Sequence, residues 1–261
     1  MNSAETHTGT IDGSPKGSPD SPSQGTTLDD RLRAEAVRIY QRYAIEVVEA
    51  LSLCPWAKRA RLDGRVRIAV VTEARPEPAH VLTHMEAIAA EPEIEIGLIL
   101  FPRLEITSRE FHRFISEVRD QDTRRHPMSN EPFYMAEFHP VAEPDTASPA
   151  RLVSFIRRSP DPTLQLVRRT TLEDIRRSAD KEAISQAQAI LASLADLADL
   201  PLHGPIHRPI HERVAESNLS TIERFGIDRM KAILDDIQRD RDESYRRLLH
   251  DADRSATRSA E

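Results

Sequence analysis

The stretch that decides the fold is "RVRIAVVTEARPEPAHVLTHMEAIAAEPEIEIGLILF", residues 65–101. Its two ends, 65–72 and 94–101, are short runs rich in β-branched and apolar residues, which is typical of strands. Between them, residues 78–90 have the composition of a helix. A strand, a helix and a second strand in this order usually form a right-handed crossover that makes the strands parallel. The stretch therefore predicts a parallel β-α-β unit.

The chain on either side of this unit extends the same architecture. The capping box "TSRE" at Thr107 predicts the start of a helix, and residues 132–139 and 163–169 have the composition of two further strands. Upstream, "TLDD" at Thr27 predicts the start of a helix that should end at Leu53, since Pro55 disfavours helical geometry just before it. The predicted fold is α/β (α+β), a four-stranded mixed sheet in β-α-β-α-β-β order flanked by helices.

Both ends of the chain differ from this central region. Residues 1–26 are mainly Ser, Thr, Gly and Pro, so we expect a disordered tail. Residues 27–226 should form a single α/β domain whose C-terminal extension is all-helical from Ala179, with Gly226 as a helix C-cap. For 227–261 we expect an exposed terminal helix and a loose end.

The composition narrows the classes of function. The net charge of −7 argues against nucleic acid as a partner, and no run of apolar residues is long enough to cross a membrane. The single cysteine, Cys54, excludes an internal disulfide. We expect a soluble cytoplasmic protein without a cofactor, and its protein partners stay unknown.

Two sets of histidines have spacings that can suit a metal. His80 and His84 lie one helical turn apart, but the glutamate of the zinc-protease motif is missing. The second set is interrupted by prolines, so it cannot occupy one helix; it comprises His203, His207 and His211. The sequence therefore predicts no metal site.

Cys54 is a candidate nucleophile. Lys58, Arg59 and Arg61 follow it closely and would lower its pKa if they faced the thiol. A position after a helix C-terminus opposes a thiolate, however, and a lone cysteine beside Trp56 is often a small buried hydrophobe. The sequence leaves both interpretations open.

A candidate base lies at the end of the third predicted strand. Alternation places Glu137 and His139 on one face, at the strand end where open α/β sheets usually bind ligands. The alternative is a histidine that only bonds a loop carbonyl ahead of Pro140.

Arginines suggest an anion site. Arg168 shares a face with Leu164 and Leu166, so it needs a carboxylate partner or an anionic ligand, unless it lies at a sheet edge with its head in water. Residues 54–67 and 151–169 each carry a net charge of +4. If these two stretches converged they would suit a carboxylate or phosphate, whereas apart they would be solvated strand edges.

Four short motifs resemble a bacterial family of uncharacterised proteins, the domain of unknown function 1415 family. They are "LCPWAK" (53–58), "FHP" (138–140), "RSPDPTLQLVR" (158–168) and, more loosely, "ESNLSTIERFG" (216–226). The sequence departs from the family pattern at Arg157, where asparagine is usual, and at Arg169, where glutamate often stands. The resemblance implies no reaction, but it implies that the motif residues form one site: Cys54, His139, Arg158, Ser159, Arg168 and Asn218.

These residues allow two classes of function. In an enzyme, Cys54 would be the nucleophile, His139 the base oriented by Glu137, and the arginines would hold an anionic substrate for hydrolysis or transfer. In a binding module the arginines and Ser159 would hold a small anion, while Cys54 only packs. Asn218, on the inward stripe of a predicted helix, would cap backbone or reach into the site. A third hypothesis is a scaffold that contacts a partner through its C-terminal helices.

Overall fold

The computed structural model describes residues 27–54, 56–126, 130–141, 155–174, 177 and 210–259. The predicted tail, the helix expected after Ala179, His203 and His207 lie outside this part of the chain, and the side chain of His211 is not described. In chain order, the elements are α1 (Leu28–Tyr43), η1 (Ala44–Glu49), α2 (Ala57–Leu62), β1 (Val66–Val70), α3 (Pro78–Ala89), β2 (Ile96–Leu100), α4 (Ser108–Arg125), β3 (Phe133–Phe138), β4 (Thr163–Arg168), α7 (Ile210–Phe225) and α8 (Ile227–Ser259).

The sheet has the order β1-β2-β4-β3. β1 and β2 are parallel, and β4 is antiparallel to both of its neighbours, β2 and β3. The predicted four-stranded mixed sheet and its parallel β-α-β unit are therefore confirmed. Since β4 reverses the direction twice, β1, β2 and β3 all run the same way.

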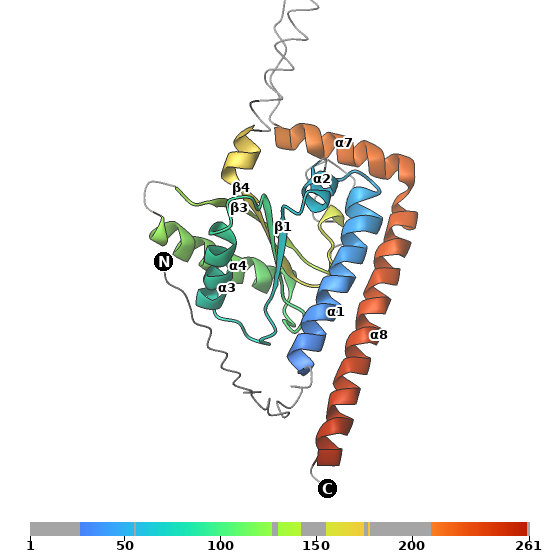
Figure 1. Cartoon of the computed structure of the whole chain (residues 1–261). Helices are drawn as coiled ribbons and strands as arrows, with labels where there is room; N and C mark the ends of the chain where they lie inside the picture. The colour runs from blue at the N-terminus through green and yellow to red at the C-terminus, as the bar shows by residue number, and fades with distance from the viewer. Residues whose placement is uncertain are drawn as a thin grey trace, which may run out of the picture.

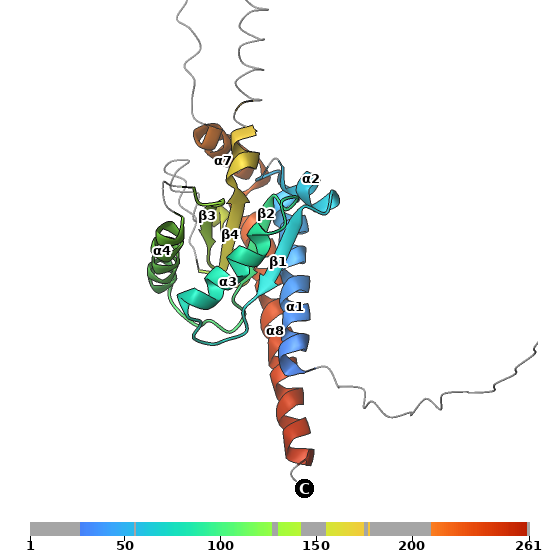
Figure 2. The same cartoon turned by 60° about the vertical axis from the view of Figure 1, so that its left-hand side comes forward.

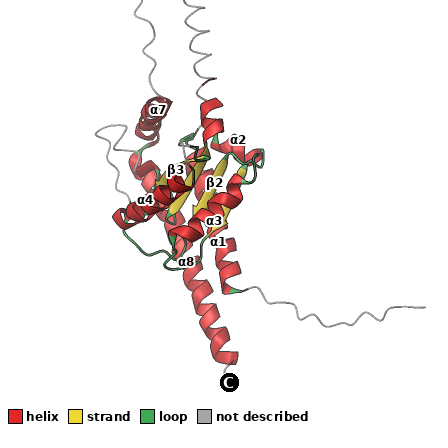
Figure 3. Cartoon of the chain, turned by 90° about the vertical axis from the view of Figure 1, so that its left-hand side faces the viewer, coloured by secondary structure: helices red, strands yellow, loops and turns green. Residues whose placement is uncertain are grey.

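Helices cover both faces of the sheet (Figures 1 and 3). α3 and α4 lie on one face, where Ile99 of β2 joins their core, and α1, η1 and α8 lie on the other, where Leu98 and Leu100 do so. Successive side chains of a strand point to opposite faces, so β2, which lies inside the sheet, is apolar at every position. The sheet thus separates two hydrophobic cores.

The first helix begins as predicted but ends earlier. Thr27 and Asp30 form the capping box at its start. Instead of continuing to Leu53, the helix widens into η1 and stops in a Schellman motif, in which Ser52 adopts a left-handed φ of 52°. The N–H of Leu53 bonds the carbonyl of Val48 at 2.9 Å, and the N–H of Ser52 bonds that of Glu49 at 3.1 Å. The helix therefore ends before Cys54, which lies in the turn that leads to α2.

The last helix differs from the expected exposed one. α8 follows α7 directly after Gly226, whose φ of 97° confirms the predicted cap, and it runs side by side with α1 (Figures 1 and 2). Met230, Leu234 and Tyr245 are buried in the core of that face. The expectation of an exposed helix is wrong here because the polar side chains of α8 are paired: Arg42 of α1 bonds both Asp236 and Asp240.

This pairing predicts acid sensitivity. Hydrogen bonds from Arg38 and Arg42 lower the pKa of Asp240 from 3.8 to about 2. A carboxylate whose pKa is lower in the folded than in the unfolded chain stabilises the fold above pH 4, and this contribution is lost as the pH falls towards 2. Because the carboxylate is partly solvated, we expect a loss of about 1 kcal/mol from it. Urea unfolding at pH 5 and pH 2.5 measures this loss, which Asp240→Asn should reduce; an equal loss in that variant would contradict the assignment.

Candidate functional site

Cys54 lies in the turn between η1 and α2. Leu53 and Trp56, on either side of it, pack into the core on the α1 face, and the amide of Asn218 on α7 donates to the carbonyl of Leu53 at 3.1 Å. Asn218 therefore caps backbone, the first of its two predicted roles. Together these contacts fix the turn that carries the thiol.

The surroundings of Cys54 do not favour a thiolate. Burial raises the pKa of its thiol above the usual value, and hydrogen bonds from the N–H groups of Trp56 and Ala57 offset only part of this increase. Two of the three basic side chains that follow are directed elsewhere: Arg59 pairs with Asp63 at 3.5 Å and Arg61 with Glu49 at 2.6 Å.

His139 uses both ring nitrogens in contacts with the backbone. Nδ1 lies 3.2 Å from the N–H of Val141, and Nε2 lies 3.1 Å from the carbonyl of Ile106. These contacts fit the tautomer that donates from Nε2 and accepts at Nδ1. The imidazole is only 8% exposed. His139 therefore has the role of the predicted alternative, a histidine that bonds a loop carbonyl.

Glu137 does not orient His139. It shares the α4 face, as expected, but its carboxylate bonds His112 at 2.9 Å and Arg119 at 3.2 Å, both on α4. Glu137 thus holds β3 against α4, and the predicted histidine–carboxylate pair is not formed.

The sheet separates Cys54 from His139. The turn around Cys54 packs on the α1 face, whereas the ring of His139 packs on Phe111 of the α4 face, with 6.0 Å between ring centroids. They also lie at opposite ends, because His139 follows the carboxyl end of β3 while Cys54 leads through α2 to the amino end of β1. In the part of the chain that the structure describes, Cys54 and His139 therefore do not face one cavity.

Arg158 and Ser159 are bonded within the protein. Arg158 donates to the carbonyl of Pro140 at 3.0 Å and to Asp235 of α8 at 2.7 Å. Ser159 is 1% exposed and donates to the carbonyl of Asp161 at 2.5 Å. Arg158 connects the segment before β4 to its neighbours, and Ser159 stabilises the turn within that segment.

Arg168 bonds backbone carbonyls, which were not among the partners that the sequence suggested for it. Its guanidinium donates to the carbonyls of Ile94 at 2.6 Å, Glu91 at 2.8 Å and Ile88 at 3.3 Å. These oxygens lie at and beyond the C-terminus of α3, where a cation is favoured by the helix dipole. The half-buried cation is thus balanced by backbone dipoles, with no need for an anionic ligand.

Neither pocket found among the described residues is lined by both basic stretches. Arg65 pairs with Glu95 at 2.5 Å and Arg67 pairs with Glu91, so these two arginines are neutralised beside β1 and β2. Among the described residues, no cluster of His, Cys, Asp or Glu has the arrangement of a metal site. None of the described helices has the length and hydropathy of a membrane span.

Sequence reasoning missed a buried ionic group. Asp161 is 1% exposed and accepts hydrogen bonds from Arg241 at 2.8 Å and from Tyr245 at 2.7 Å. An arginine and a tyrosine four residues apart lie on one helix face. This spacing in the sequence could have indicated that one face of α8 packs against the rest of the protein. The group joins α8 to the loop before β4.

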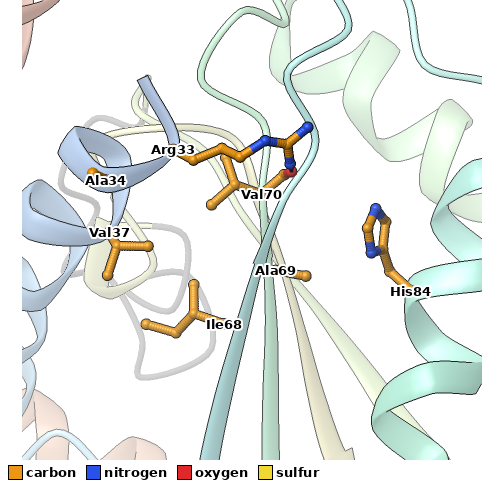
Figure 4. A pocket seen from close by; sticks show the side chains of 7 residues that line it. All are labelled: Arg33, Ala34, Val37, Ile68, Ala69, Val70 and His84. Atoms are coloured by element: carbon orange, nitrogen blue, oxygen red, sulfur yellow. Dashed lines mark hydrogen bonds between the residues drawn. The ribbon is translucent and has the colours of Figure 1, made fainter. Parts of the chain in front are cut away.

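Sequence reasoning also missed an open groove of about 600 Å³ along the outer side of β1. Figure 4 shows α1 residues on one side, His84 of α3 on the other, and β1 between them, with Arg33 reaching across to the end of the strand. Its lining is mainly apolar, with Ala34, Val37 and Ile68 on the α1 side.

The described part of the chain is thus an α/β protein with a four-stranded mixed sheet and helices on both faces. The chain belongs to the family described as "Protein of unknown function (DUF1415)", whose model matches residues 35–197. α7 and α8, and with them Asn218, lie outside the matched residues. Neither a curated protein nor a solved structure matches the chain.

Proposed function

We propose that this protein is a non-catalytic binding module for protein partners. One observation carries the proposal: both ring nitrogens of His139 are hydrogen-bonded to backbone groups, and the ring lies on the side of the sheet away from Cys54. A cysteine nucleophile needs a base within hydrogen-bond reach or a lowered pKa, and Cys54 has neither among the residues that the structure describes.

A protein partner is favoured over a small anion. The guanidinium groups of Arg158 and Arg168 are bonded to protein oxygens, which an anion would have to displace. The open groove beside β1 has the apolar lining of a surface that contacts another chain. This supports binding through surface complementarity.

A cysteine-dependent hydrolase or transferase is the second candidate. It is favoured by the two N–H groups, of Trp56 and Ala57, that bond the sulfur of Cys54, since such donors stabilise a thiolate. In that case a substrate, or a residue outside the described ones, would supply the base.

The alkylation rate of Cys54 separates the two candidates. Because burial raises its pKa, we expect native Cys54 to react with iodoacetamide at pH 7 at least about tenfold more slowly than in urea. Mass spectrometry of quenched samples gives both rates. Asn218→Ala, which frees the turn, should accelerate the native reaction and so serves as the positive control. A native thiol that reacts faster than the unfolded one would overturn the binding-module proposal in favour of the enzyme.

A further inference from the structure

β1 is an edge strand with free pairing capacity. Arg65 accepts from the N–H of Ile96 at 3.2 Å, and Val71 donates to Leu100 at 2.9 Å, so these residues direct their backbone groups at β2. Backbone groups alternate along a strand, so those of the intervening residues Val66, Ile68 and Val70 point outward. The carbonyl of Val70 already accepts a hydrogen bond from Arg33, which leaves Val66 and Ile68 for pairing. Within the described residues, no strand pairs with this outer side.

α1 and α3 border the groove beside β1 as its two walls, so a further strand that paired with β1 would lie between these two helices. α1 contributes Ala34 and Val37 on one face of the sheet plane, and α3 contributes His84 on the other (Figure 4). A segment paired with β1 would direct alternate side chains against these walls. Ala34 is an exposed and small residue, so the α1 wall leaves room for apolar side chains.

Arg33 places a positive charge at one end of the groove. Its guanidinium donates to the carbonyl of Val70 and to the hydroxyl of Thr72, the latter at 3.1 Å. Both acceptors are neutral, although the Thr72 hydroxyl donates in turn to Asp29 at 3.0 Å, and no described carboxylate lies within ion-pair distance of Arg33. A carboxylate would form a stronger, charge-assisted bond with this guanidinium than a carbonyl does.

We propose that the groove binds an extended segment of another protein, which pairs with β1 and offers alternate apolar side chains and an acidic residue to Arg33. This deepens the proposed function, on which it rests, by naming the site and the chemistry of the partner. The mode is strand addition, in which backbone hydrogen bonds give affinity and side-chain contacts give selectivity.

The charges favour an acidic partner over a second copy of this chain. Arg65 and Arg67 are already paired with Glu95 and Glu91, whereas Arg33, at the end of the strand, has no ion pair among the described residues. Pairing β1 with its own copy would bring no acidic residue of that strand to Arg33, because β1 has none. An acidic partner instead supplies the carboxylate that Arg33 lacks.

The test uses two blocked heptapeptides that alternate valine and threonine between identical end residues, aspartate in one and lysine in the other. Aspartate at both ends brings a carboxylate to Arg33 whichever way the peptide runs. We expect the aspartate peptide to shift the amide NMR signals of Val66 and Ile68 saturably, with a Kd at least about tenfold lower than that of the lysine peptide.

Two variants locate the contacts, and a third is their control. Arg33→Gln should reduce the preference for aspartate to less than about threefold. Ala34→Gln, which fills the groove, should abolish the shifts, while Thr83→Gln on the solvent side of α3 should leave them unchanged. Urea unfolding of each variant verifies that it folds.

Three outcomes would overturn the inference. They are unshifted β1 amides at millimolar peptide, shifts confined to other elements, and shifts that depend on protein concentration without peptide, which would mean a second copy. Each leaves the alkylation result untouched, so a failure of this site is distinguishable from a failure of the proposed function.

Discussion

The Asp161→Asn variant should lose about 3–5 kcal/mol of stability, the range for a buried ion pair that loses one partner. Asp161 is almost fully buried and neutralises Arg241, whose guanidinium also donates to the carbonyl of Pro102 at 3.0 Å. Asparagine keeps the size of the side chain but leaves the charge of Arg241 without its buried partner. Urea unfolding followed by circular dichroism measures the loss.

Asp242→Asn is the matched control. Asp242 pairs with the same Arg241 at 2.9 Å, but its side chain is 45% exposed. An exposed ion pair contributes at most about 1 kcal/mol, so this variant should stay close to the parent protein. Equal losses in the two variants would contradict the importance of burial at Asp161.

Arg168→Gln should cost about 2–3 kcal/mol of stability, since three carbonyl oxygens lose a charged donor. Arg67→Gln, in which an exposed arginine paired with Glu91 is replaced, should cost less than about 1 kcal/mol. Thermal unfolding compares the two variants. If Arg168→Gln were as stable as the parent protein, the structural role of Arg168 would be wrong and the anion-binding prediction would regain its basis.

Much of the fold could be predicted because its patterns are local. The strands are short apolar runs, and the capping boxes at Thr27 and Thr107 specify helix starts through contacts three residues apart. The strand order could not be predicted, since the position of β4 between β2 and β3 depends on pairing across more than sixty residues, from Ile99 to Leu164. The burial of α8 could not be predicted, because its many charged residues suggested a solvent-exposed helix, whereas several of them pair with α1.

The candidate site was predicted less well because side-chain partners are long-range. Sequence reasoning placed Arg168 on the face of Leu164 and Leu166 correctly, yet nothing local indicates that the end of α3 lies opposite it. Likewise, the place of His139 at a strand end was right, but the carbonyl of Ile106 that holds it is 33 residues away. The shared face of Glu137 and His139 did not decide which partner each one takes.

The position of β4 in the sheet has a consequence for biosynthesis. The ribosome synthesises β1, β2 and β3 before β4, yet β2 and β3 are joined in the sheet only by β4, which pairs with both. Until residues 163–168 leave the exit tunnel, the nascent chain carries two strands with unsatisfied edges, a condition that invites mispairing with neighbouring chains. Chaperone demand during translation should therefore peak in this interval and fall once β4 has emerged.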